Sequence, residues 1–130
     1  MTRDDGSWRL SARPEEVSNL RHRVRAFAEQ AGVRAQVLDD LTLAVSEAVT
    51  NVVIHAYRDG PPGTIDVTAT VSDGHLEVLV RDDGVGMRPR PDSPGLGLGL
   101  PLIASLAPDS RVTAHANHGT EVWMRFPRTS

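Results

Sequence analysis

The sequence has 130 residues, a formal net charge of -3 and no cysteine, and 39% of its residues are hydrophobic. This length predicts a single domain over residues 1–130, with one core that folds without disulfides, and the lack of cysteine excludes a thiolate metal site. The acidic balance argues against direct binding of nucleic acid. No run approaches the roughly 18 apolar residues of a membrane span, and the N-terminus does not resemble a secretory signal. We therefore expect a cytoplasmic protein without membrane contact.

The first half of the chain predicts a strand and two helices. Trp8 and Leu10 alternate with polar residues, which predicts a short strand over residues 7–10. Residues 14–31 predict a helix, because Pro14 suits a first helical position, apolar residues recur at spacings of three and four, and Gly32 follows as a stop. Residues 34–57 predict a longer helix with a wide apolar face, as expected for burial against a sheet.

The second half predicts two hairpins separated by a loop and a helix. Residues 64–72 and 75–81 alternate apolar and polar side chains around a Ser-Asp-Gly turn, which predicts an antiparallel pair. We expect a loop over residues 82–97, then a short helix over 98–106 in which Pro101 is tolerated because it lies in the first turn. Strands over 110–116 and 120–127 close the chain. This order predicts an α+β two-layer sandwich, with the helices on one face of a mostly antiparallel sheet.

Three polar residues interrupt the long, mainly apolar second helix. Glu47, Asn51 and His55 are spaced by four, so in an α-helix they lie along one face. Geometry alone leaves two interpretations, the lining of a site or the solvated edge of an amphipathic helix.

Two glycine-rich segments follow. Asp82 directly follows a predicted strand, and Gly84 and Gly86 after it permit close approach of the backbone to a ligand. The Asp82 carboxylate can accept a hydrogen bond from an amine of that ligand. An ordinary Asp-Gly turn is the alternative. The run Gly95–Leu100 opens a helix, where free N–H groups and the helix dipole favour a phosphate. Its spacing matches neither the Rossmann fingerprint nor the P-loop.

Taken together, these segments resemble a known family over essentially the whole chain. Four motifs resemble the N, G1, G2 and G3 boxes of the GHKL (Bergerat-fold) ATPase superfamily: ExxxN at Glu47–Asn51, DxGxG at Asp82–Gly86, GxGxGL at Gly95–Leu100 and GT at Gly119–Thr120. Within that superfamily, the strings LAVSEAVTNVVIHAY and VRDDGVGM are most similar to the small anti-sigma-factor serine/threonine kinases.

The resemblance implies ATP and Mg²⁺ as cofactors and assigns roles by position. Asn51 matches the magnesium ligand, Glu47 the general base and Asp82 the reader of the adenine amine. The other matched positions are Gly84 and Gly86 beneath the adenine, Gly95, Gly97, Gly99 and Leu100 of the box around the phosphates, and Thr120 near the adenine-reading Asp. His55 matches a polar position near the phosphates, with a buried, hydrogen-bonded histidine as the alternative.

The chain departs from the family pattern in the segment between the G1 and G2 boxes. This segment, MRPRPDSP over residues 87–94, is short and contains three prolines, which stiffen it. Ser93 and Pro94 stand where related kinases often place an Arg against the γ-phosphate, and Arg88 and Arg90 are candidate substitutes. Nucleotide binding is therefore better supported than phosphotransfer.

The resemblance implies a protein kinase that phosphorylates a STAS-type anti-sigma antagonist, sequesters a sigma factor and forms a homodimer. A non-catalytic ATP- or ADP-binding regulatory module is the alternative. The catalytic portion of a histidine kinase is disfavoured, because only 42 residues precede Leu43 and the first strand and helix use them. The basic run over residues 21–25 is either a partner patch or a solvated helix face.

Overall fold

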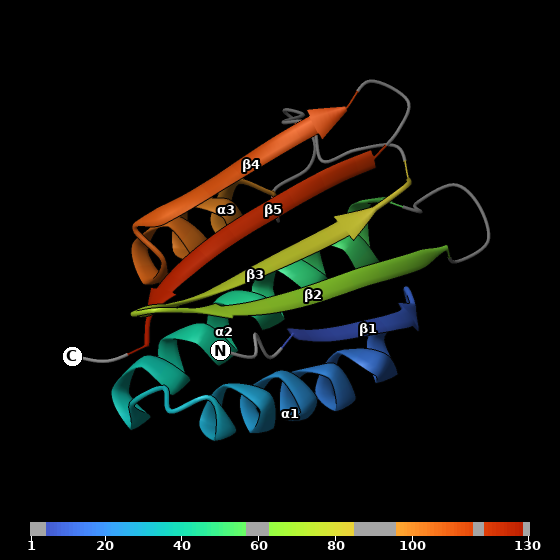
Figure 1. Ribbon diagram of the computed structural model, residues 1–130. Coiled ribbons are helices and arrows are strands. Elements are labelled where there is room, and N and C mark those ends of the chain that lie inside the picture. Colours follow the sequence, from blue (N-terminus) through green and yellow to red (C-terminus); the bar gives the residue numbers. More distant parts are fainter. Residues whose placement is uncertain (1–4, 57–62, 85–95, 116–118, 129–130) are drawn as a thin grey trace.

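A computed structural model shows a five-stranded sheet and three α-helices over the residues that it describes (Figure 1). The structure describes residues 5–56, 63–84, 96–115 and 119–128, with the backbone alone for residues 55, 56, 96–100, 114 and 115. The elements in chain order are β1 (Asp5–Ser11), α1 (Pro14–Gln30), α2 (Ala35–Asn51), the π-helical turn η1 (Val52–Ala56), β2 (Thr64–Ser72), β3 (His75–Asp82), α3 (Leu96–Leu106), β4 (Asp109–His115) and β5 (Gly119–Pro127).

The sheet has the strand order β1-β2-β3-β5-β4, and each neighbouring pair is antiparallel. In Figure 1, α2 and α3 lie behind the sheet and α1 lies below β1. Residues of these helices pack in one core with the sheet, which leaves its other face open. Alternate residues of β2, such as Ile65 and Val67, are fully buried and pack in one core with Leu41, Val45 and Val49 of α2. Each such side chain contributes roughly 1.5–3 kcal/mol on burial. The predicted α+β two-layer sandwich is confirmed.

Helix α1 follows its sequence signals closely. Pro14 occupies the first turn, and Leu20, Val24 and Ala28 form the buried stripe. Gly32 has a φ of 88°, and its N–H bonds the Glu29 carbonyl while the Val33 N–H bonds that of Ala28. These two bonds form a Schellman motif, which is why a glycine ends this helix.

Three predicted boundaries were wrong. Strand β1 extends over Asp5–Ser11 because β2 pairs with all seven residues, which local alternation does not reveal. The second helix is α-helical only to Asn51 and continues as the π-helical turn to Ala56.

The third correction concerns Pro101. Helix α3 begins at Leu96, so Pro101 is its sixth residue and lies inside the helix rather than in its first turn. A proline there provides no N–H for the carbonyl of Gly97, four residues earlier. The packing of α3 against α2 stabilises a helix start that glycine-rich residues do not favour on their own.

Candidate functional site

The C-terminal half of α2 brings two polar side chains to the covered side of the sheet. Asn51 is only 4% exposed and Glu47, one turn earlier, is half-buried. The Asn51 Nδ2 is buried and has no hydrogen-bond partner among the described residues. Leaving such a group unsatisfied costs about 1–3 kcal/mol, so a polar amide kept here is typical of a ligand site. Rotation of the side-chain amide by 180° exchanges Nδ2 with Oδ1, and an amide oxygen is a suitable ligand for a hard cation.

The predicted common face of Glu47, Asn51 and His55 extends past the end of the α-helix. Glu47 and Asn51 are four residues apart within α2 and therefore share a face. After Asn51 the hydrogen-bond pattern changes to i→i+5 in the π-helical turn η1. His55 lies in that turn and its side chain lies outside the described part of the structure, so its place on this face stays a prediction.

Asp82 is the last residue of β3 and is 8% exposed. Its Oδ1 accepts a hydrogen bond of 2.9 Å from the Gly84 N–H, whereas Oδ2 is buried without a partner among the described residues. Burial raises the pKa of the Asp82 carboxyl, and the charge of neighbouring Asp83 raises it further. Hydrogen bonds from the backbone N–H groups of Gly84 and Thr120 lower the pKa and so offset part of this rise. Oδ2 is therefore a buried acceptor available to a ligand donor such as an amine.

The start of β5 fits tightly against the turn that carries this carboxylate. Gly119 has a φ of 90°, and a Cβ added there would lie 1.9 Å from the backbone oxygen of Asp82. Only glycine fits this contact. The contact places Thr120, which is 1% exposed, with its backbone N–H on the Asp82 carboxylate. The motif Gly119–Thr120 was noticed in the sequence, but no role was assigned to Gly119, because a close backbone approach between distant strands leaves no local signal.

The glycines of the GxGxGL motif are only partly described by the structure. Gly97, Gly99 and Leu100 lie in the first two turns of α3, which packs beside α2. An α-helix N-terminus presents free N–H groups and a positive dipole end, both favourable to a phosphate. The predicted residues Gly86 and Gly95, and the segment 87–94 with Arg88, Arg90, Ser93 and Pro94, lie outside the described residues.

The structure thus joins Asp82, Gly84 and Thr120 in one cluster, and α2, which carries Glu47 and Asn51, contacts both strands of that cluster. The side chains that are described contain no group of three or more His, Cys, Asp or Glu residues able to hold a metal. A magnesium ion bound mainly by phosphates and water needs only one or two protein ligands, and the unsatisfied Asn51 amide fits that requirement.

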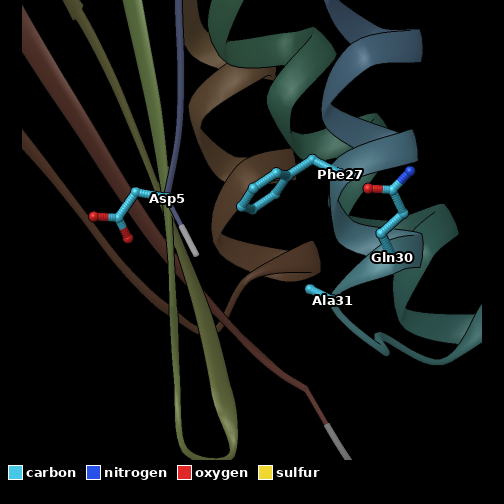
Figure 2. A pocket seen from close by; sticks show the side chains of 4 residues that line it. All are labelled: Asp5, Phe27, Gln30 and Ala31. Carbon is cyan, nitrogen blue, oxygen red and sulfur yellow. The ribbon is translucent and has the colours of Figure 1, made fainter. Parts of the chain in front are cut away.

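A separate hollow of about 320 Å³ lies at the opposite end of the sheet, lined by Asp5, Phe27, Gln30 and Ala31. Asp5 pairs with Thr70, far along β2 from Ile65, the partner of Asp82. In Figure 2 the Asp5 carboxylate points away from the Phe27 ring, so the hollow lacks a charged group directed into it. It contributes nothing to the motif cluster.

The other sequence candidates have structural explanations. In the basic run, Arg25 forms an ion pair of 3.1 Å with Asp39 and so links α1 to α2, while His22 and Arg23 are exposed. Trp8 and Trp123 are half-buried strand residues, as expected, and Trp8 packs edge-on against Phe27 with the ring centroids 5.7 Å apart. Among the described helices, none has the length and apolar character to span a membrane.

Comparison with known proteins agrees with this geometry. The family model of the histidine kinase-like ATPase domain matches residues 10–126. An anti-sigma F factor of Geobacillus stearothermophilus is 30% identical over 134 residues, which cover 95% of this chain and 92% of that protein. The anti-sigma F factor of Clostridium acetobutylicum is 32% identical over 125 residues, covering 88% and 87%.

A solved structure of RsbU and RsbW domains from Mycobacterium tuberculosis shares the fold, with a TM-score of 0.73 at 21% identity. The match covers 94% of this chain but only 31% of the solved one.

Proposed function

Because the chain belongs to the histidine kinase-like ATPase family, and within it to the GHKL anti-sigma kinases, we propose that it is a Mg²⁺- and ATP-dependent protein serine/threonine kinase. One observation carries the proposal. The two motif side chains expected to meet opposite ends of the nucleotide, Asn51 and Asp82, each keep a buried polar atom without a partner among the described residues. A ligand that satisfies both atoms removes that cost.

At the adenine end, the chain's own groups set the recognition. Oδ2 of Asp82 accepts a hydrogen bond from the exocyclic amine, and the Gly84 N–H holds the carboxylate through Oδ1. Guanine carries a carbonyl at the corresponding position, where it would oppose an ionised carboxylate. The site therefore favours adenine.

At the phosphate end, Asn51 would hold a magnesium ion, and the N-terminus of α3 would bind the phosphates. When bound, the ion neutralises phosphate charge. Glu47 accepts the proton of a serine or threonine hydroxyl of the protein substrate, while the hydroxyl oxygen forms a bond to the γ-phosphorus of ATP. The bond from that phosphorus to the bridging oxygen breaks and ADP leaves.

The partners follow from the family and remain part of the proposal. The relatives are named anti-sigma F factors, which supports a sigma factor as the sequestered protein. The resemblance points to a STAS-type antagonist as the phosphorylated protein, to a homodimer as the working form and to the cytoplasm as its location.

Label transfer tests the kinase directly. The protein, labelled ATP, Mg²⁺ and purified STAS-type antagonists are incubated, and transfer to serine is expected. Glu47→Gln should lower the rate by about 10²–10⁴-fold, as for loss of a general base, while ATP affinity stays unchanged. Wild-type protein that binds ATP and labels none of the antagonists would exclude this activity.

One observation favours the second candidate, a non-catalytic nucleotide-binding module. Ser93 and Pro94 stand where related kinases often place an Arg, directly before the G2 box. In that case Glu47→Gln would leave sigma-factor binding and its response to nucleotide unchanged, and no label would transfer. Acid-labile autophosphorylation would instead indicate a histidine kinase.

A further inference from the structure

The open face of the sheet carries a hollow away from the nucleotide motifs. The hollow has a volume of about 370 Å³ and is lined by Leu79, Arg111, Thr113, Glu121 and Trp123. Trp123 of β5 pairs in register with Leu79 of β3 on one side and with Arg111 of β4 on the other. We call these five residues the outer-face hollow. Helix α2, which carries Glu47 and Asn51, lies on the other side of the sheet (Figure 1).

The Trp123 ring in this hollow is held in a fixed orientation. Its Nε1–H donates a hydrogen bond of 3.2 Å to Oε1 of Glu77. The guanidinium carbons of Arg111 and Arg125 lie 5.8 Å and 5.7 Å from the ring centroid, within cation–π range. An aromatic side chain fixed before binding loses little entropy when a partner arrives, and Trp and Arg are the residues that most often dominate interface energies.

Most of the arginines on this face form ion pairs, whereas Glu77 instead accepts the Trp123 N–H. Three arginines of this face each pair with a carboxylate on a neighbouring strand: Arg9 with Asp66 at 2.7 Å, Arg81 with Glu121 at 3.2 Å, and Arg125 with Asp109. Arg111 is exposed and contacts the Trp123 ring, but no described side chain gives it a carboxylate. The hollow therefore combines the apolar side chains of Leu79 and Trp123 with Arg111, which forms no ion pair with a described residue, while Glu121 in the same lining is paired with Arg81.

We propose that the outer-face hollow docks an acidic segment of a partner protein. A carboxylate of that segment pairs with Arg111, because this guanidinium lines the hollow and forms no ion pair with a described residue. An aliphatic side chain next to the carboxylate packs on Leu79 and the face of Trp123. This docking surface is independent of the proposed kinase reaction, since none of its residues belongs to the nucleotide motifs.

Nuclear magnetic resonance of the full chain tests the proposal with a defined probe. The probe is an acetylated and amidated peptide of alternating Glu and Leu, and the control peptide has Lys in place of Glu. The chain has two tryptophans, so two indole N–H signals report separately on the open face (Trp123) and on the β1–α1 packing (Trp8). The Glu peptide is expected to shift the Trp123 signal saturably and to leave the Trp8 signal in place.

Matched variants distinguish recognition of the carboxylate by Arg111 from non-specific binding of the peptide. Arg111→Gln should weaken binding of the Glu peptide by about tenfold, as expected for loss of a charge-assisted contact, and Arg111→Lys should retain part of it. Arg9→Gln removes a positive charge from the same face at the other edge of the sheet and should leave the affinity unchanged.

Three results would overturn the proposal. The first is the absence of a saturable Trp123 shift at millimolar Glu peptide, and the second is equal binding of the Lys peptide. The third is a wild-type dimer that Arg111→Gln dissociates in analytical ultracentrifugation, which would identify the face as an interface between two copies of the chain.

Discussion

At the residue scale, the proposed adenine end of the site depends on one buried carboxylate and on the backbone that holds it. Asp82 has one oxygen bound to the Gly84 N–H and one without a described partner. Its neighbour Asp83 is exposed and therefore provides a control with the same charge change.

The first prediction concerns nucleotide affinity. Asp82→Asn replaces an ionised acceptor by an amide, so ATP affinity should fall at least about tenfold, which corresponds to a charge-assisted hydrogen bond. Asp83→Asn should change it less than about twofold, as expected for screened surface charges. Calorimetric titration with ATP measures both. Equal losses in the two variants would show that net charge, rather than Oδ2, sets the affinity.

The second prediction concerns pH. Burial raises the pKa of the Asp82 carboxyl above its ordinary value of about 3.9. Ionisation therefore opposes folding: stability is fully present below that ordinary pKa and is lost as the pH rises through the raised value. The stability of Asp82→Asn relative to wild type should grow as the pH rises from just below 4 towards neutrality. Urea denaturation across this range measures the difference, and a constant difference would contradict it.

The third prediction concerns the contact between Gly119 and Asp82. In Gly119→Ala the new Cβ would lie 1.9 Å from the Asp82 carbonyl oxygen, at a φ of 90° that alanine disfavours. Overpacking and the backbone penalty together should cost about 2–5 kcal/mol. Gly74→Ala has a similar φ of 81° and nothing within 4 Å, so it should cost only about 1–2 kcal/mol. Chemical denaturation measures the free energy of unfolding of both variants. Similar losses of stability would mean that the close approach between Gly119 and Asp82 does not affect stability.

At the element scale, the sequence predicted those features whose cause is local. Apolar spacing and the Gly32 stop defined α1, and alternation with a Ser-Asp-Gly turn defined the β2–β3 hairpin. The π-helical turn after Asn51 and the early start of α3 depend on packing between elements, which has no periodic signature. The motifs matched Asp82 and Asn51 to roles that stay predictions, and the side chain of His55 lies outside the described residues.

The fourth prediction concerns Pro101 within α3. Its side chain is exposed, and as the sixth helical residue it provides no N–H for the Gly97 carbonyl. Pro101→Ala restores that donor without leaving a cavity, so it should stabilise the protein by about 1–3 kcal/mol. Pro108→Ala, just beyond the helix, should be neutral or destabilise by up to about 1 kcal/mol, because it only increases the freedom of the unfolded chain. Thermal unfolding followed by circular dichroism distinguishes the two.

At the scale of the whole molecule, the sheet and the helices share one core, and the candidate site lies at the adjoining ends of α2, β3 and β5. The layer arrangement was predictable from the order of elements, but the strand order β1-β2-β3-β5-β4 was not, because antiparallel pairing of distant strands leaves no local pattern. The buried apolar residues of α2 contact those of the sheet in a single continuous cluster. Unfolding should therefore be one cooperative transition that removes the nucleotide site with the core.

The fifth prediction tests this single core with two leucines of the same helix. Leu41 is fully buried, whereas Leu43 is 44% exposed. Leu41→Ala should cost about 2–5 kcal/mol through lost burial and a cavity, and Leu43→Ala should cost less than about 1 kcal/mol. In Leu41→Ala the indole N–H signals of Trp8 and Trp123, on opposite faces of the sheet, should disappear at the same lower urea concentration. Separate midpoints would show that the β1–α1 layer and the strands near the nucleotide motifs unfold independently, and the site would then not depend on one shared core.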